Sequence, residues 1–341
     1  MIMPDARAIG KAAEIITRGG LVAMPTETVY GLAADAASDA AVARVFEAKG
    51  RPRFNPLIVH VADLAMARTL ADFPPLAEKL AAAFWPGPLT LVLARKSRSP
   101  LTPAKGGVHE TGNMDPGFRR DERGEVSLLV SAGLDTIALR APDHPAAQGL
   151  IRAAGRPLAA PSANRSGTVS PTRPEHVRES LGDMVDFILD AGPCPVGVES
   201  TIVKIEDEKA FLLRPGGLAR EEIERVTGAP LATPAQSDRV EAPGNLESHY
   251  APQARLRIDA DAPRPDEAFL AFGPSAPDSP YALNLSPAGD LREAAANLFA
   301  YLRRLDALCA KHGLSGVAAA PIPVKGLGEA INDRLARAAH P

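Results

Sequence analysis

The sequence predicts an α/β protein with two domains, the larger built on a twisted mixed sheet with flanking helices. The chain has 341 residues, enough for two separate cores. Helical and strand patterns alternate along it, but without the strict regularity of a doubly wound parallel sheet. A stretch of linker composition begins at 229 and precedes a shorter α/β pattern. We therefore expect an N-terminal domain over 1–228, a linker over 229–252 and a small C-terminal domain over 253–341.

The elements of the N-terminal domain follow from apolar periodicity and from turn residues. Helices are predicted where apolar residues recur at helical spacing, over 6–17, 39–48, 64–83 with a break near 74–75, 145–154 and 175–181. Strands are predicted at the short apolar runs 21–25, 56–61, 85–94, 135–140, 156–164 and 186–192, with a hairpin formed by 200–206 and 210–216.

The C-terminal part repeats the same alternation on a smaller scale. Strands are expected at 254–260, 267–273, 280–286 and 315–322, and helices at 290–311 and 326–339. One segment of the N-terminal part has no periodicity at all. Residues 97–125 are rich in Pro, Gly and charge, which predicts a long, mobile surface insertion between two strands.

Composition excludes several classes of protein. A net charge of −3 and a pI near 6.2 give no overall electrostatic case for nucleic-acid binding. Cys194 and Cys309 are the only cysteines, so a disulfide framework and a cysteine-rich zinc site are excluded. No signal-peptide pattern or apolar run of membrane-spanning length occurs. We expect a cytoplasmic protein that does not enter the membrane.

Familiar catalytic motifs are absent, so any nucleotide site must be of a less common kind. The sequence has no GxxxxGK[ST] loop, no GxGxxG that opens a helix after a strand, and no GxSxG or HExxH. The strongest local signal is Lys49-Gly50-Arg51-Pro52-Arg53, directly before a buried strand. Cations spaced by two can converge on a polyphosphate, although a solvated charged turn is the alternative reading.

Several longer motifs occur in one order along the chain, and together they carry a resemblance. They are PTETVYGL (25–32), KGRPRFNPLIVH (49–60), WPGPLTLVL (85–93), DTIALR (135–140), APSAN (160–164), SPTRPEHV (170–177), VESTIV (198–203), LLRPGG (212–217), SHYAP (248–252) and KGLGEAINDRLARAA (325–339). The series resembles the YrdC-like threonylcarbamoyl-AMP synthase family, in its longer two-domain branch. The resemblance implies a YrdC-like N-terminal sheet and a Rossmann-like C-terminal domain, and the 97–125 insertion departs from it.

The resemblance also implies which residues bind the substrates. Threonine would be bound by Thr28, His60, Arg140, Ala160 and Ser200. ATP would be bound by Arg51, Asn55, Thr136, Ser162, Asn164, Ser170, Arg214 and Tyr250. The catalytic cations would be Lys49, Arg51 and Arg53, acting on the phosphates together with Mg²⁺ that enters with ATP. No protein ligand is assigned to the metal.

The activity implied is the joining of L-threonine, bicarbonate or CO₂, and ATP into threonylcarbamoyl-AMP and pyrophosphate. The product would pass to a tRNA threonylcarbamoyl transferase, and the sequence leaves direct tRNA binding by this chain open. Two alternatives stay open at this point. One is an RNA-binding module that uses the basic cluster without ATP turnover. The other is a related carbamoyl- or adenylate-handling enzyme with a different acceptor.

Overall fold

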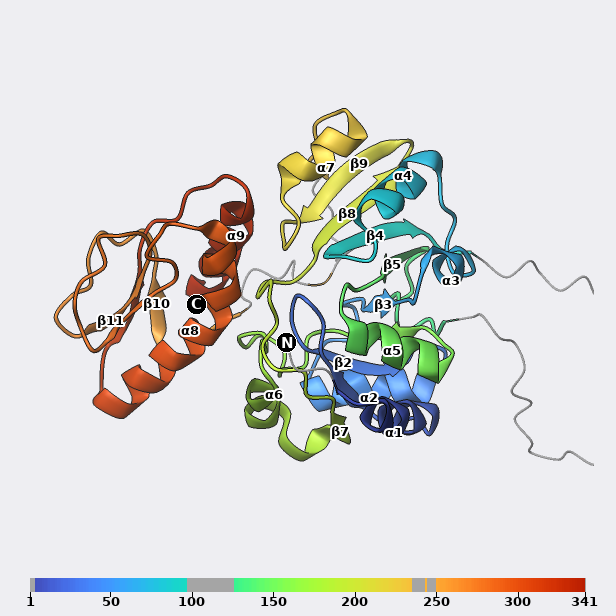
Figure 1. Ribbon diagram of the computed structural model, residues 1–341, viewed down its shortest axis with the longest axis horizontal. Coiled ribbons are helices and arrows are strands. Elements are labelled where there is room, and N and C mark those ends of the chain that lie inside the picture. The colour runs from blue at the N-terminus through green and yellow to red at the C-terminus, as the bar shows by residue number, and fades with distance from the viewer. Residues whose placement is uncertain (1–3, 97–125, 235–242, 244–249, 341) are drawn as a thin grey trace, which may run out of the picture.

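The computed structural model describes residues 4–96, 126–234, 243 and 250–340. The predicted insertion at 97–125 lies outside this part, as do residues 235–242 and 244–249 of the predicted linker. Figure 1 shows two bodies, a larger one around a long sheet and a smaller one with its own sheet. Within the described residues, no helix is both long enough and apolar enough to cross a membrane.

The larger body is built on a mixed sheet of nine strands. Their order across the sheet is β7 (Phe187–Ile188), β1 (Val22–Met24), β2 (Gly31–Asp35), β6 (Leu158–Ala159), β3 (Ile58–His60), β5 (Thr136–Arg140), β4 (Leu89–Ala94), β8 (Thr201–Glu206) and β9 (Lys209–Arg214). The pairs β1–β7, β3–β5 and β4–β8 are parallel and the others antiparallel. The predicted mixed sheet, including the β8–β9 hairpin, is confirmed.

Helices cover the two faces of this sheet unequally. They are α1 (Ala6–Thr17), α2 (Asp39–Lys49), α3 (Leu64–Arg68), α4 (Pro75–Phe84), α5 (Pro145–Ala154), α6 (Pro174–Leu181) and α7 (Arg220–Thr227), with a short 3₁₀ turn at Gly182–Met184. Side chains of α2, α4, α6 and α7 join the main core on one face. On the other face, α1 and α5 pack together over β7, β1, β2 and β6.

Among the described residues, no helix packs on that second face where β3, β4, β5 and β8 run. Side chains alternate between the faces of a strand, so residues two apart in sequence share a face. Ile58, Val92, Ala138 and Ile202 form a small apolar cluster there to which no helix contributes. The fold thus leaves part of one sheet face open for a binding site.

The smaller body has a parallel sheet of four strands. Its order is β10 (Arg255–Arg257), β13 (Gly316–Ala319), β11 (Glu267–Ala271) and β12 (Ala282–Asn284), packed with α8 (Leu291–His312) and α9 (Leu327–Ala339). This small α/β domain was predicted. Its core continues into the larger body, because Val29, Val169 and Val198 belong to the same apolar cluster.

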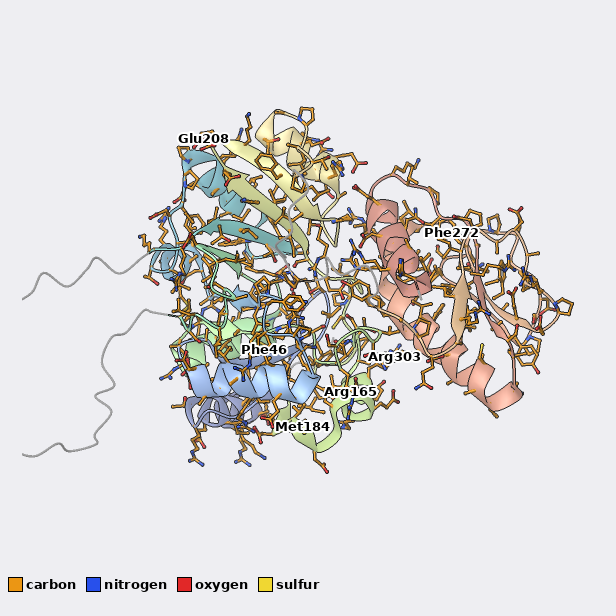
Figure 2. The ribbon with its side chains drawn as sticks, turned by 180° about the vertical axis from the view of Figure 1, so that it is seen from behind. Phe46, Arg165, Met184, Glu208, Phe272 and Arg303 are labelled. Atoms are coloured by element: carbon orange, nitrogen blue, oxygen red, sulfur yellow. The ribbon has the colours of Figure 1, made fainter. Side chains whose placement is uncertain are left out.

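Polar contacts also join the two bodies. Arg220 of α7 binds Glu329 of α9 at 2.5 Å, and both side chains are half-buried. Arg303 of α8, which Figure 2 shows on the side of that helix toward the larger body, donates to the carbonyl oxygen of Val169. The smaller body therefore packs against the larger one through α8 and α9.

Two elements differ from the expectation. The strand β2, with the sequence GLAAD, is fully buried but has no β-branched or aromatic residue, so nothing in its sequence favours a strand. The helix α7, REEIERVT, buries Ile223 alone, so it lacks an apolar stripe. Tertiary pairing and packing determine both elements, and local pattern could not reveal them.

Candidate active site

A cavity lies on the sheet face that helices leave bare, beside the loops after β1, α2 and β6. Arginine side chains enter it from three places in the chain. The predicted site residues that line it are Arg51, His60, Arg140, Ala160, Ser162, Ser200, Arg214 and Tyr250. The structure therefore brings together residues that are nearly 200 positions apart in sequence.

Strand geometry explains why His60 and Arg140 meet. Both end their strands, and they are paired neighbours in the parallel β3–β5 ladder. Alternation puts them on the same face as Ile58 and Ala138, the open one. The residues Ile58, His60 and Arg140 thus form one wall of the cavity.

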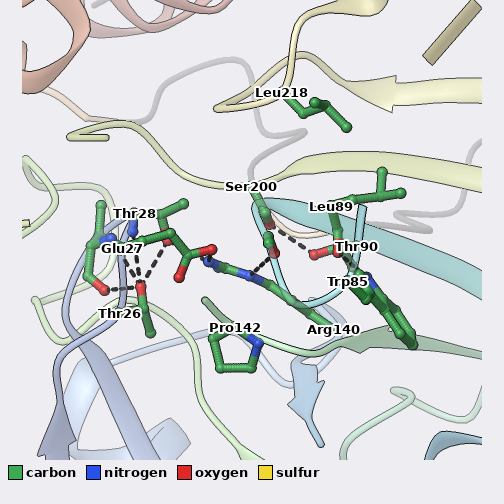
Figure 3. A network of polar contacts seen from close by, with 12 residues as sticks. Thr26, Glu27, Thr28, Trp85, Leu89, Thr90, Arg140, Pro142, Ser200 and Leu218 are labelled. Carbon is green, nitrogen blue, oxygen red and sulfur yellow. Dashed lines mark hydrogen bonds and ion pairs between the residues drawn. The ribbon is translucent and has the colours of Figure 1, made fainter. Parts of the chain in front are cut away.

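A network of polar contacts fixes the Arg140 guanidinium (Figure 3). Its Nη2 donates to Glu27 Oε1 at 2.5 Å, its Nη1 to Thr28 Oγ1 at 2.9 Å, and its Nε to the carbonyl oxygen of Gly87 at 3.2 Å. The Arg140 and Glu27 side chains are only 4% and 6% exposed, so this is a buried ion pair. These contacts use three of the five guanidinium N–H groups, so within the described residues two remain for a ligand, enough for one carboxylate.

Burial keeps His60 uncharged. Desolvation, with a smaller contribution from the nearby Arg140 charge, lowers the pKa of His60 to about 3. In the described part of the chain its Nδ1 has no hydrogen-bond partner, and the same holds for Glu27 Oε2, Asn55 Nδ2 and Asn164 Oδ1. Buried polar atoms in native proteins are nearly always hydrogen-bonded. Of these four residues, His60 lines the cavity, so its Nδ1 marks a place where a ligand could bind.

Arg51 reaches the cavity through a sharp turn after α2. The helix ends at Lys49, and Gly50 adopts the left-handed conformation with φ of 59°, which favours glycine. The guanidinium donates to Asn55 Oδ1 at 2.6 Å and to the carbonyl oxygens of Asn55 and Pro56. Desolvation lowers the pKa of Arg51 to about 10, so the side chain stays charged at neutral pH.

Lys49 contacts protein backbone and does not line the cavity. Its Nζ donates to the carbonyl oxygens of Ser162 at 2.6 Å and Asn164 at 2.5 Å. Asn164 in turn donates from Nδ2 to the carbonyl oxygen of Thr168. Desolvation, and next the neighbouring Arg51 charge, lower the pKa of Lys49 well below its ordinary value. Lys49 and Asn164 therefore hold the 160–164 loop in place around Ser162.

Arg214, at the end of β9, lies against the start of β8. It donates to the Ser200 carbonyl oxygen at 2.8 Å and to the Pro243 carbonyl oxygen at 3.0 Å. Ser200 Oγ is 2.8 Å from Thr90 Oγ1 (Figure 3). The chain after Arg214 passes so close to Ser200 that it requires Gly216, because a Cβ there would lie 2.4 Å from the backbone of Ser200.

Tyr250 closes the cavity on the side of the smaller body. It is 1% exposed, has a positive φ of 64°, and stacks on Phe299 of α8 with ring centroids 5.5 Å apart. The guanidinium of Arg334, from α9, lies over the same ring at 5.0 Å. A positive φ is uncommon for a residue with a side chain, so packing must hold it.

Glu199 is the carboxylate that lines the cavity, and both of its oxygens are engaged. Ser170 Oγ donates to Oε1 at 2.5 Å and Arg334 Nε to Oε2 at 2.9 Å. The described residues contain no group of three His, Cys, Asp or Glu side chains that could hold a metal ion.

Two predicted residues lie away from the cavity. Arg53 is exposed in the turn after Arg51, so Lys49, Arg51 and Arg53 do not converge as their spacing had suggested. Thr136 shares a face with Arg140 but begins β5 while Arg140 ends it, about 13 Å along the strand. Thr28, Asn55 and Ser170 sit behind the cavity wall, each bonded to a lining side chain.

Glu27, Glu199 and Arg334 were not among the predicted site residues. Each occurs inside a motif that sequence analysis singled out. Glu27 and Glu199 are the single charged residues of their motifs, which is a local signal, whereas Arg334 is one of several charged residues in its motif. Their roles depend on partners far away in the sequence. Glu27 binds Arg140, 113 positions away, and Glu199 binds Arg334, 135 positions away. Such pairing has no local sequence pattern.

Two family models match the chain. One, shared by Sua5, YciO and YrdC proteins and described as "Telomere recombination", matches residues 14–116 and 118–216. The other, described as "Threonylcarbamoyl-AMP synthase, C-terminal domain", matches residues 218–340. The two models together span nearly the whole chain.

Individual relatives agree with these models. A threonylcarbamoyl-AMP synthase of Pyrococcus abyssi is 40% identical over 96% of this chain and 92% of the relative. A threonylcarbamoyl-AMP synthase of Bacillus subtilis is 38% identical over 97% of this chain and 92% of the relative. The crystal structure of P. abyssi Sua5 complexed with L-threonine superposes with a TM-score of 0.82 at 37% identity, and covers 98% of this chain and 95% of that one. The chain therefore belongs to the threonylcarbamoyl-AMP synthase family, in its two-domain Sua5 form.

Proposed function

We propose that this protein is a nucleotidyltransferase that joins L-threonine, bicarbonate or CO₂, and ATP into threonylcarbamoyl-AMP, with release of pyrophosphate. One observation carries the proposal: a single cavity has Arg140 at one wall and Arg51 and Arg214 at another. A carboxylate and a polyphosphate each need such a cation, and joining them requires that both lie in one site.

In this proposal, threonine occupies the wall formed by β3 and β5. Its carboxylate binds the two remaining N–H groups of Arg140, with Thr28 fixing the guanidinium from behind. The uncharged His60 offers Nδ1 to the amine or hydroxyl. Ala160 would contribute its backbone and Ser200 its hydroxyl at the boundary with the nucleotide.

The nucleotide occupies the wall formed by the loop after α2, the 160–164 loop and the end of β9. Arg51 and Arg214 would bind phosphate oxygens, with Ser162 and Tyr250 beside them. Lys49, Asn55, Asn164 and Ser170 support this wall from behind. Thr136 and Arg53 lie outside the cavity, which favours a role for them that involves no direct contact with ATP.

The chemistry asks mainly for alignment. Threonine's ammonium group first loses a proton to solvent. The free amine then forms a C–N bond to CO₂ and loses a second proton to solvent, which gives a carbamate anion. A carbamate oxygen then bonds to the α-phosphorus, and the bond from that phosphorus to the β-phosphate bridging oxygen breaks. Arginines that are fixed before the reaction stabilise the charge on the leaving pyrophosphate. We expect Mg²⁺ to enter with ATP on phosphate oxygens, where it would neutralise further charge.

The product is a mixed anhydride that water can hydrolyse, so its use must follow soon after its release. We propose handover to a tRNA threonylcarbamoyl transferase, and a cytoplasmic location fits that role. Tyr250, which packs on the core of the smaller body, lines the cavity on one side, and we expect it to help keep bulk water from the reacting groups.

The test is pyrophosphate release by the purified protein with ATP, Mg²⁺ and bicarbonate, with and without L-threonine. We expect release that requires threonine and bicarbonate, and that falls on the order of 100-fold or more in Arg51→Ala and in Arg140→Ala. Arg152→Ala, which removes an exposed arginine of α5, is the matched control and should keep full activity.

Other outcomes would point elsewhere. Release without threonine would leave an ATP enzyme with a different acceptor. No release, together with salt-dependent tRNA binding that Arg51→Ala abolishes, would favour an RNA-binding module.

A further inference from the structure

The three arginines that line the cavity differ in what balances their charge. Arg140 is paired directly with a carboxylate, since its Nη2 lies 2.5 Å from Glu27 Oε1. Within the described residues, Arg51 and Arg214 instead donate to uncharged oxygens of Asn55, Pro56, Ser200 and Pro243. Two walls of one cavity thus hold arginines of different effective charge.

The other ionisable groups near the cavity do not cancel this difference in charge between the surroundings of Arg140 and those of Arg51 and Arg214. On the Arg140 wall, burial lowers the pKa values of His60 and of the neighbouring His144, so both are uncharged at neutral pH. Glu199 also lines the cavity and is near Arg214, but it is already paired with Arg334 of α9. The Arg140 wall is therefore close to neutral, and the Arg51 and Arg214 wall is positive.

This asymmetry matches two ligands of different charge. An amino acid at neutral pH is a zwitterion with no net charge, whereas a nucleoside triphosphate carries several negative charges. A buried arginine without a counter-charge would bind a phosphate strongly, and a misplaced phosphate would block the amino acid. Sorting the two ligands within one cavity therefore needs a difference in charge and not only in shape.

We propose that Glu27 is the specificity-determining residue that reserves the Arg140 wall for a zwitterionic amino acid and excludes phosphate from it. It acts through Arg140, so it is a positioning residue as well as a counter-charge. The proposal rests on the proposed function, because it assumes an amino acid at Arg140. It assigns to Glu27 a role that a merely structural ion pair would not have.

The test replaces the charge and keeps the hydrogen bond. In Glu27→Gln the amide oxygen can still accept from Arg140, but the negative charge is gone. Threonine affinity is measured by calorimetry, without nucleotide, against increasing inorganic phosphate at constant ionic strength. In the native protein we expect phosphate to leave threonine affinity unchanged while it competes with ATP. In Glu27→Gln we expect phosphate to compete with threonine and to weaken its apparent affinity by at least about tenfold at the highest phosphate concentration.

A matched control removes a neutral contact to the same guanidinium. Thr28→Val loses the 2.9 Å bond to Arg140 Nη1 but keeps the Glu27 charge. It should weaken threonine binding without making threonine binding sensitive to phosphate. If Glu27→Gln and Thr28→Val respond to phosphate alike, Glu27 has only a structural role and the proposal is wrong.

The titration of the native protein with phosphate can still contradict the proposal if Glu27→Gln does not fold. Phosphate that displaces threonine from the native protein would overturn the proposal at once, because the wall would then not exclude it. Failure of the native protein to bind threonine at all would instead overturn the proposed function on which this inference rests. The two failures are thus distinguishable in one titration series.

Discussion

Arg51 is only 8% exposed, yet it remains charged at neutral pH because its pKa falls to about 10 and no further. Burying a charge with only neutral partners costs several kcal/mol, so a protein rarely keeps such a group without a use for it. Arg53, two residues on, is exposed and solvated. The two arginines look equivalent in the sequence, but only one has been desolvated.

Mutation should separate them. Arg51→Ala removes a desolvated cation from the cavity and should weaken ATP binding on the order of tenfold to 100-fold, whereas Arg53→Ala should change it less than about threefold. Equilibrium binding of a non-hydrolysable ATP analogue measures both. Equal losses would show that Arg53 reaches the phosphates, as its spacing from Lys49 had suggested.

His60 should make stability depend on pH. Its folded pKa of about 3 lies below the unfolded value near 6.5, so between these values the unfolded chain binds more protons than the native protein. Stability is complete above about pH 6.5 and falls as pH decreases, by up to about 1.4 kcal/mol per pH unit. His60→Gln should therefore flatten the unfolding free energy between pH 4 and 6.5 without abolishing the slope, because burial also lowers the pKa values of His144 and His176.

Chemical denaturation at several pH values measures this effect. An unchanged slope in His60→Gln would mean that His60 already titrates normally in the folded protein. Threonine binding by the native protein above pH 6.5 should show no titration from His60.

At the scale of elements, the end of α2 decides where Arg51 points. Ser38 caps the start of this helix through Ala41 N, and Gly50 ends it in the left-handed conformation. A Cβ at Gly50 would meet nothing within 4 Å, so Gly50→Ala carries a conformational cost alone. We expect Gly50→Ala to lower the unfolding free energy by about 1 kcal/mol. ATP affinity should also fall, because a change in the Gly50 backbone would move Arg51.

Gly10→Ala provides the comparison, since it is also free of contacts but lies inside α1, where alanine favours the helix. It should stabilise the protein slightly. Destabilisation by both substitutions in equal measure would contradict a role for the Gly50 turn.

Most helices and strands were predictable because their apolar residues follow the period of their own geometry. The prediction failed for β2 and α7, where burial comes from neighbours: β2 lies between β1 and β6, and α7 packs on α4. The spacing of Lys49, Arg51 and Arg53 misled for a related reason. Alternation by two applies to extended chain, but Lys49 ends a helix and Arg53 lies in a turn.

At the scale of the molecule, the smaller body supplies part of the cavity's electrostatics. Arg334 of α9 is fully buried, binds Glu199 at 2.9 Å and also donates to the Pro215 carbonyl oxygen. Removing one partner of a buried ion pair costs about 3–5 kcal/mol, so Arg334→Met should strongly lower the unfolding temperature. Arg334→Met combined with Glu199→Gln should recover part of the loss. A double variant no more stable than the single one would argue against the pair.

Tyr250 should control how long the nucleotide stays bound. The resemblance to the family predicts that it covers the nucleotide. Tyr250 lines the cavity, and its ring packs against Phe299 and the Arg334 guanidinium. Tyr250→Ala should accelerate nucleotide dissociation by at least about tenfold while changing threonine affinity little. Stopped-flow displacement of a fluorescent ATP analogue measures the rate. Unchanged dissociation would remove this role from Tyr250.

In the proposed reaction, one cavity holds an amino acid and ATP so that a carbamate of the first can attack the second. The most direct measurement is the mass of the product formed from threonine, ATP and ¹³C-bicarbonate, trapped by rapid quenching. We predict an adduct of threonine and AMP that contains one ¹³C atom, and no such adduct from Arg140→Ala. An adenylate of threonine without the labelled carbon, or AMP without any adduct, would rule out attack of a threonine carbamate on ATP.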